Sequence, residues 1–372
     1  MELLDDLQEM RKIDQADMLE AISSVPEHYL AALDIVKKSS LKKFLSKEIA
    51  NCVIAGVGGS AIGGDIICNW VERRVGLPIQ VCRDYHLPAY ANRRTAVIAI
   101  SYSGETAETL NQFLEAYERN CVLAGVCSGG RLEKICSELG IPLVKVEKGL
   151  QPRAALPYLF VAPALLMERL GLIENAEREI KSAVENLRKI REKVGASIPV
   201  QQNPAKRLAL SLVGKFPIIY SLRRVDSVAR RLKNQFNENS KVSAKVDFLP
   251  EASHNEIEGW GKALNSVFSI IFVRDNGESQ EEISGIEEMK SLLEKSGISD
   301  MNEIRGEAET VLGRLLSAIY YCDYVSYYLA IARGVDPTPV ERIQMLKKRI
   351  LERTKFQETL DERMKELKFQ RS

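Results

Sequence analysis

The stretch that decides the fold is residues 51–65, NCVIAGVGGSAIGGD, in which an apolar run of strand type meets a glycine-rich turn. A helical pattern follows at residues 66–74. Residues 95–106, TAVIAISYSGET, repeat this plan with a serine-rich turn, and a helical pattern follows at residues 107–119. Ligands of open α/β sheets bind at the carboxyl ends of parallel strands. The two turns therefore predict one shared ligand site.

The residue types in these turns favour a phosphate as the ligand. Glycines let the backbone approach a ligand closely, and a helix start offers free N–H groups to an anion. Ser60, Ser101, Ser103 and Thr106 add hydroxyl donors. We interpret the two turns together as a phosphate cradle. The alternative for either turn alone is that its small residues only permit a tight passage from strand to helix.

A dinucleotide site is a second alternative for the first turn. The fingerprint of such a site is Gly-x-Gly-x-x-Gly with an acidic residue about 20 residues further on. Gly56, Gly58 and Gly59 fit that spacing poorly, although Asp84 follows the next predicted strand. The serine-rich second turn is not required by a dinucleotide site, so the phosphate cradle is favoured.

The whole chain predicts an α/β protein with two tandem domains, each a flavodoxin-like three-layer α/β/α unit built on a parallel sheet. Strands and helices alternate over residues 49–172, and the pattern returns more faintly over residues 201–335, as an old duplication would produce. The expected strands are residues 51–55, 79–82, 95–100, 121–127 and 142–146 in the first domain, and 216–221, 243–248, 267–273 and 301–304 in the second.

Helical segments flank and join these domains. Residues 1–48 show helical spacing of apolar residues, interrupted at Pro26, and residues 173–200 contain a charged linker helix. Residues 336–372 are predicted as a C-terminal helix and charged tail, the last 15 residues being a solvated tail or helix end.

Composition excludes several classes of partner and site. The 372 residues carry a net charge of +1, which gives no sign of a nucleic-acid or membrane partner. Seven cysteines without a Cys-x-x-Cys spacing, together with three histidines, favour reduced thiols and no metal site. No apolar run reaches the roughly 18 residues of a membrane span. The N-terminus lacks a signal-peptide core, so we expect a cytoplasmic protein. The sequence also offers no site for a metal or redox cofactor, and we expect none.

Three polar segments outside the cradle carry candidate chemistry. Arg153, in the turn QPR, offers a planar fork of donors for a phosphate or an enolate oxygen, unless it is a surface arginine capping a loop. Glu238 lies among the amides of residues 234–241, which can hold a carboxylate for proton transfer or can simply cap a helix. His254 lies in a predicted loop among polar residues, where a histidine can act as an acid or base, although a lone histidine is more often structural.

Six motifs, in order between Ile54 and Lys347, resemble those of the bifunctional phosphoglucose/phosphomannose isomerases, which have two tandem sugar-isomerase (SIS) domains. They are GVGGSAIGGD, SYSGETAET, QPRAALPY, NENSK, PEASHNEIEGW and DPTPVERIQMLK. The serine-rich turns are shared by all SIS proteins, whereas QPR, NENSK and SHNEI point to this family. Two departures are Pro157, where the family usually has glycine, and Glu105, where SGNT-like variants are common.

The resemblance implies roles for individual residues. Glu238 would be the base that moves a proton between C1 and C2, and Arg153 would stabilise the charge of the cis-enediolate. His254 would assist ring opening from the other subunit of a homodimer. Lys347 matches a lysine that the family carries late in its sequence, and Lys348 is adjacent to it. Thr338 lies near this region and could help the site to accept mannose phosphate as a substrate. The sugar phosphate would be bound by Gly59, Ser60, Ser101, Ser103 and Thr106.

The implied activity is the interconversion of glucose 6-phosphate and mannose 6-phosphate with fructose 6-phosphate, which needs no metal or redox cofactor. Three alternatives stay open. A sugar-phosphate sensor would need neither Glu238 nor His254, but a DNA-binding head is not evident. The isomerase half of a glucosamine-phosphate amidotransferase would follow a glutaminase domain, which Met1-Glu2-Leu3 does not suggest. An NAD-dependent dehydrogenase is disfavoured by the glycine spacing.

Overall fold

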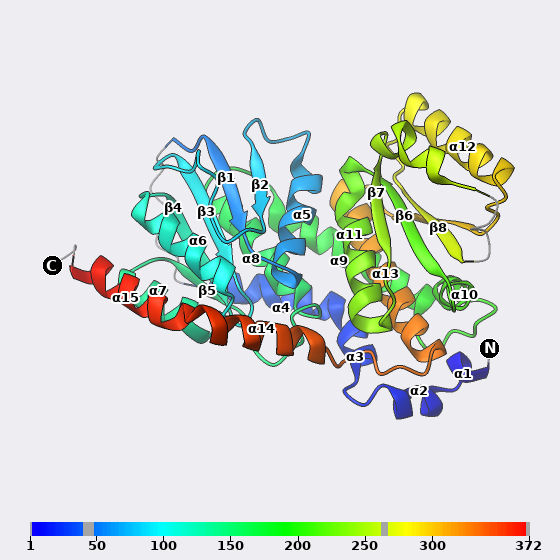
Figure 1. Cartoon of the computed structure of the whole chain (residues 1–372), viewed down its shortest axis with the longest axis horizontal. Helices are drawn as coiled ribbons and strands as arrows, with labels where there is room; N and C mark the ends of the chain where they lie inside the picture. Colours follow the sequence, from blue (N-terminus) through cyan, green and yellow to red (C-terminus); the bar gives the residue numbers. More distant parts are fainter. Residues whose placement is uncertain (1, 40–47, 262–266, 370–372) are drawn as a thin grey trace.

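The computed structural model of the chain describes residues 2–39, 48–261 and 267–369, and contains two parallel sheets that lie side by side (Figure 1). The first sheet has the strand order β2-β1-β3-β4-β5. Its strands agree with the predicted ones to within one or two residues at each end. They are β1 (Asn51–Ala55), β2 (Ile79–Cys82), β3 (Thr95–Ile100), β4 (Val122–Cys127) and β5 (Leu143–Lys145).

The second sheet repeats the order of the first with four strands, β7-β6-β8-β9, and every pairing in both sheets is parallel. Its strands are β6 (Phe216–Leu222), β7 (Lys245–Leu249), β8 (Phe268–Arg274) and β9 (Met301–Arg305). The prediction of two tandem α/β domains is therefore confirmed. A shared strand order is also what the predicted duplication requires.

Helices cover both faces of the first sheet, as its uninterrupted apolar strands require. Along β1 and β3, Ile54 and Ile98 belong to the larger hydrophobic core, whereas Val53 and Val97 belong to a second core on the opposite face. Successive residues of a strand point to opposite faces, so each strand contributes to both cores. From β1 the strand order runs outward to β2 on one side and to β3, β4 and β5 on the other. The carboxyl ends of β1 and β3 are therefore the topological switch point of the sheet.

The helix after β1 begins earlier than the sequence pattern predicted. Helix α5 spans Gly59–Val71, so that most of the glycine-rich stretch is helical and the turn itself is short. The helical glycines of this stretch allow close packing against α8 (Leu156–Arg169), because a Cβ atom at Gly63 would overlap the carbonyl oxygen of Leu159. These glycines therefore serve helix packing as well as the turn.

Two long helices join the halves of the molecule. Helix α9 (Ala176–Val194), the charged linker helix of the sequence analysis, packs along α13 (Val311–Ala332) and buries an apolar stripe that includes Val184 and Leu187. Helix α13 begins at Val311, because the Thr310 side chain accepts a hydrogen bond of 3.0 Å from the Gly313 N–H and caps the helix there.

The remaining helices surround these elements. They are α1 (Glu2–Asp5), α2 (Leu7–Ile13), α3 (Met18–Ser23), α4 (Val25–Lys38), α6 (Ala107–Glu118), α7 (Gly130–Leu139), α10 (Pro204–Ser211), α11 (Asp226–Gln235) and α12 (Gln280–Lys295). Residues 40–47, which belong to the predicted N-terminal helical segment, lie outside the described residues. The predicted domain boundaries stay predictions.

Of the two expectations for the last 15 residues, a solvated tail or a helix end, the described residues agree with the helix end and contradict a solvated tail. Helix α14 (Glu341–Thr354) is followed by α15 (Phe356–Phe369), which lies along the first domain (Figure 1). Leu360, Met364 and Leu367 are buried in the second core of the first domain, and Arg363 binds Glu118 at 2.6 Å. Apolar side chains spaced four and three residues apart give the charged helix one buried stripe. None of the described helices combines the length and apolarity needed to cross a bilayer.

Candidate active site

The two predicted turns meet at the switch point of the first sheet. The Ser60 hydroxyl, at the start of α5, accepts a hydrogen bond of 3.3 Å from the backbone N–H of Tyr102. Within the second turn, the buried Ser101 hydroxyl donates to the Thr106 hydroxyl at 2.9 Å. Ser103 is exposed at the tip of this turn. The structure thus gathers Gly59, Ser60 and the hydroxyl residues of the second turn at one edge of the sheet.

The tip of the serine-rich turn depends on Gly104. Its φ is +72°, and a Cβ atom at this position would overlap the carbonyl oxygen of Gly129. Glu105, the departure that places a negative charge beside the cradle, accepts a hydrogen bond of 2.8 Å from the Arg131 N–H. Its carboxylate is therefore directed to the start of α7, where a helix N-terminus favours negative charge.

Substitution of Gly104 by alanine is expected to damage this turn selectively. The left-handed backbone and the overlap with Gly129 together should lower the free energy of unfolding by about 2 kcal/mol or more and weaken binding at the cradle. Urea unfolding and titration with fructose 6-phosphate measure the two effects. Gly76→Ala is the matched control, since a Cβ there meets no atom within 4 Å. Equal effects of the two variants would contradict the role given to Gly104.

Arg153 lies directly beside the cradle. A Cβ atom at Gly59 would lie 2.9 Å from the carbonyl oxygen of Pro152, so the start of α5 touches the main chain of the QPR turn. The Arg153 side chain is only 2% exposed, which excludes a surface arginine. Its Nε donates to Asn239 Oδ1 at 2.6 Å, and its Nη2 donates to the carbonyl oxygens of Pro337 and Thr338 at 2.8 and 2.9 Å.

The remaining guanidinium nitrogen of Arg153 faces Glu238. Nη1 lies 3.6 Å from Glu238 Oε2, is buried, and has no hydrogen-bond partner among the described residues. Burial lowers the pKa of the Arg153 guanidinium, and the charge of Glu238 opposes that change. Glu238 lies in a π-helical turn, Phe236–Ser240, that continues α11, and such turns are frequent at functional sites. A buried cation and a half-buried carboxylate therefore meet next to the cradle.

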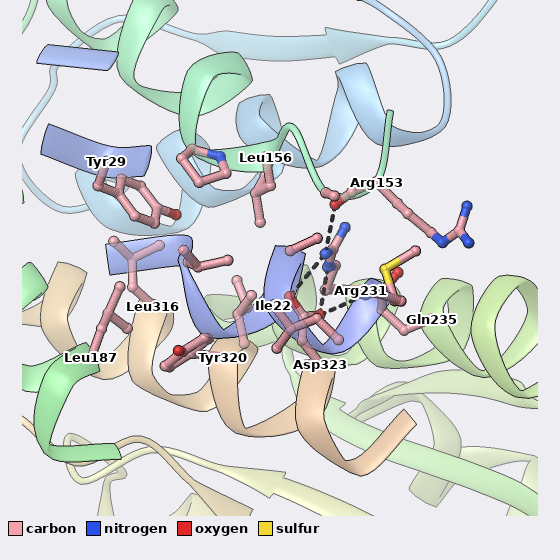
Figure 2. Close-up of a pocket in the computed structure, with 16 residues that line it drawn as sticks. Ile22, Tyr29, Arg153, Leu156, Leu187, Arg231, Gln235, Leu316, Tyr320 and Asp323 are labelled. Atoms are coloured by element: carbon pink, nitrogen blue, oxygen red, sulfur yellow. Dashed lines mark hydrogen bonds and ion pairs between the residues drawn. The ribbon is translucent and has the colours of Figure 1, made fainter. Parts of the chain in front are cut away.

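The main chain of Arg153 is held from the second domain (Figure 2). Arg231 Nη2 donates to the Arg153 carbonyl oxygen at 2.8 Å, and Arg231 makes two hydrogen bonds of 2.9 Å to Asp323. Gln235 Nε2 donates to Asp323 at 2.9 Å. Figure 2 shows these groups at one end of an apolar cavity, with the Arg153 side chain directed away from it. Because α11 and α13 carry the network, they fix the loop that presents the Arg153 guanidinium.

Two predicted site residues are not brought to Glu238 within one chain. His254 is exposed in a short 3-10 turn, Glu251–His254, and Lys347 is exposed on α14. Neither makes a hydrogen bond or ion pair within the described part of the chain. Lys348 only approaches Glu352 on its own helix, at 3.9 Å. The roles of these residues stay predictions, and that of His254 depends on a second subunit.

The Arg231–Asp323 pair was missed by sequence reasoning. The two residues are 92 positions apart, on helices whose packing a spacing rule does not reveal. One signal was present, since Asp323 is the single acidic residue in the 22-residue apolar helix α13. A buried carboxylate requires a charged or hydrogen-bonding partner.

The second sheet lacks a comparable cradle at its own switch point, as far as the described residues show. The turns after β6 and β8 are joined by a hydrogen bond of 2.5 Å from Arg224 to the Gly277 carbonyl oxygen. Asp275 pairs with Arg314 at 2.7 Å, and Arg274 pairs with Glu278 at 2.6 Å. Because the side chains of this edge are paired with one another, the first domain carries the candidate phosphate site.

Comparison of the chain with known proteins identifies its family. Residues 201–350 match the family model of the bacterial phospho-glucose isomerase C-terminal SIS domain. A bifunctional phosphoglucose/phosphomannose isomerase from Caldicellulosiruptor bescii is 37% identical over 338 residues, which cover 90% of this chain and 99% of that protein. The chain belongs to the bifunctional phosphoglucose/phosphomannose isomerase family.

Further relatives are more distant but also extensive. A bifunctional phosphoglucose/phosphomannose isomerase from Aquifex aeolicus is 33% identical over 80% of this chain and 89% of its own length. Among solved structures, a hypothetical protein from Thermus thermophilus superimposes with a TM-score of 0.72 at 14% identity, covering 93% of each chain. This likeness supports the fold, and the resemblance inferred from the motifs is confirmed by the sequence relatives.

Proposed function

We propose that this member of the bifunctional phosphoglucose/phosphomannose isomerase family interconverts glucose 6-phosphate and mannose 6-phosphate with fructose 6-phosphate through a cis-enediolate. The observation that carries the proposal is the meeting of Arg153 and Glu238 beside the cradle. Arg153 Nη1 is buried, has no hydrogen-bond partner among the described residues, and lies 3.6 Å from the Glu238 carboxylate. A base next to an unsatisfied cationic donor is the pair that proton abstraction beside a carbonyl group requires.

The cradle would bind the phosphate and orient the sugar. Gly59 and Ser60 would offer groups at the start of α5, and Ser101, Ser103 and Thr106 would offer hydroxyls from the second turn. Binding energy from this non-reacting phosphate can be used to hold the reacting carbons in place. Contact between Gly59 and the Pro152 main chain supports the arrangement, since it sets the cradle directly beside Arg153.

Glu238 would carry the proton in both directions. From the open-chain aldose, its carboxylate takes the proton of C2, the C–H electrons form the C1=C2 bond, and the carbonyl electrons move to O1. Return of the proton to C1, with transfer of a proton between the oxygens, gives the ketose. Arg153 would stabilise the negative charge that develops on the enediolate oxygens. Both epimers can be used if C2 is presented from either side by rotation about C2–C3.

The remaining roles require a second subunit or a further contact. His254 would enter from the partner of a homodimer and assist ring opening, which agrees with its exposure in the single chain. Lys347 or Lys348 would supply the late lysine of the family. Thr338 is proposed to help admit mannose phosphate. Its hydroxyl is buried and unpaired in the described structure, and its carbonyl oxygen binds Arg153.

A coupled assay with fructose 6-phosphate tests the activity. Glucose 6-phosphate and mannose 6-phosphate are followed separately with the purified protein. Formation of both products is expected. Tight binding of fructose 6-phosphate without either product would instead identify a sugar-phosphate sensor and would contradict the proposed catalysis.

A further inference from the structure

Lys241 lies beside the Arg153–Glu238 pair, although neither the sequence motifs nor the roles above give it a function. It directly follows the π-helical turn that carries Glu238. Its Nζ donates to the carbonyl oxygen of Glu238 and, at 3.1 Å, to that of Pro337. Arg153 Nη2 donates to the same Pro337 oxygen at 2.8 Å. Two cationic side chains thus converge on one carbonyl group next to the proposed base.

The backbone at Lys241 is unusual for a lysine. It is left-handed, with φ at 56° and ψ at 36°, at a helix end where glycine or asparagine is the usual residue. A side chain other than glycine is strained in this conformation, and such strain is concentrated at functional sites. Glycine would adopt this backbone conformation with less strain than lysine does. The lysine side chain at this position is directed towards Arg153 and Glu238.

Charges of both signs surround the ammonium group of Lys241. Arg153, from the QPR turn, is a like charge. Glu238, from the preceding turn, and Asp336, from the loop after α13, are the opposite charges that face it. Lys241 is exposed as a whole residue, but partial desolvation of its ammonium group, together with the charge of Arg153, lowers its pKa to about 8. Its two described acceptors are neutral carbonyl oxygens, which leaves one of its three N–H donors without a partner among the described residues.

An anion formed between these cations would relieve their repulsion. The enediolate is such an anion, and a preorganised charged donor is most effective where charge develops during the reaction. We infer that Lys241 is a second cationic residue of the active site, which acts with Arg153 to stabilise the oxygens of the enediolate. This inference rests on the proposed isomerase function. It differs from a purely structural role, in which the lysine would only cap the carbonyl groups at the helix end.

Three substitutions separate these roles. Lys241→Met removes the cation, and the expected result is a fall in kcat/KM on the order of 10²-fold, mainly in kcat. Lys241→Arg keeps a cation and should retain more activity than Lys241→Met. Lys241→Gly removes the cation but relieves the left-handed strain, so its melting temperature should equal or exceed that of the wild type while its activity falls.

Lys355 supplies a matched control. It also ends a helix in the left-handed conformation, with φ at 48°, but it lies between α14 and α15. Lys355→Met and Lys355→Gly should leave isomerase activity unchanged. If the Lys355 variants and the Lys241 variants behave alike, the special role of Lys241 is overturned.

The pH profile gives a readout that a capping role would not change. The ammonium is lost as pH rises through its lowered pKa, so wild-type kcat/KM should fall above about pH 8. In Lys241→Arg the fall should move to higher pH, and in Lys241→Met it should disappear. Full activity of Lys241→Met, or an unchanged alkaline fall in it, would overturn the inference. Absence of isomerisation by the wild type would instead overturn the proposed function itself.

Discussion

Replacement of Glu238 by glutamine is expected to lower kcat/KM for isomerisation of fructose 6-phosphate by a factor of about 10²–10⁴, the range that a positioned general base supplies. Both products are affected because one carboxylate serves both epimers in the proposed mechanism. Glutamine preserves the shape of the side chain, and the carboxylate is 3.6 Å from Arg153 rather than in a tight hydrogen bond. The fold and the binding of fructose 6-phosphate should therefore change little.

The measurement for Glu238→Gln is the initial rate for each product, together with sugar-phosphate affinity by calorimetry. Glu192→Gln, at an exposed position of α9, is the control for removing a carboxylate elsewhere. The assignment of Glu238 fails if the variant keeps more than about a tenth of the wild-type rate, which lies outside the range expected for loss of a general base.

Substitution of Asp323 by asparagine should produce the largest loss of stability. Arg231 and Asp323 are 3% and 4% exposed, so the variant leaves a buried guanidinium without its counter-charge. Breaking a buried pair in this way costs about 3–5 kcal/mol of unfolding free energy. Urea unfolding measures the loss. Glu307→Gln, in a pair with Lys193 that is more than half exposed, should change stability by less than about 1 kcal/mol.

A double variant separates the stability of this pair from its position beside Arg153. Arg231→Met with Asp323→Leu replaces the buried charges by apolar groups, which can restore most of the stability. The Arg153 carbonyl oxygen still loses the 2.8 Å hydrogen bond from Arg231. We expect a folded protein with kcat/KM reduced about 10-fold or more, since small displacements of a catalytic group have large effects. A double variant that is stable and fully active would show that the pair does not position Arg153.

Much of the fold followed from the sequence because its strands are continuous apolar runs separated by turns. Val97 and Ile98 are buried on opposite faces of the sheet, and an uninterrupted apolar run is the pattern expected of a strand that is covered on both faces. The meeting of the two turns was also predictable, since the carboxyl ends of β1 and β3 must lie at one edge of a parallel sheet. Local pattern and topology agree at these positions.

Other features depend on contacts between distant segments. The glycines inside α5 pack closely against α8, and the burial of α15 follows from contact with the first domain, which its charged composition concealed. The Arg231–Asp323 pair joins two helices of the second domain to a loop of the first. Such pairings require the three-dimensional arrangement, because neither residue type nor spacing specifies its partner.

The most direct test of the central claim is conversion of fructose 6-phosphate in D₂O, with the deuterium content at C2 of both aldose products followed by NMR. The account predicts that part of the glucose 6-phosphate and mannose 6-phosphate carries solvent deuterium at C2, because the Glu238 carboxyl group can exchange the proton taken from C1 with solvent before returning it to C2. It also predicts almost no product with Glu238→Gln. Products formed without solvent deuterium at C2 and at an unchanged rate in the variant would contradict a Glu238-mediated enediolate mechanism.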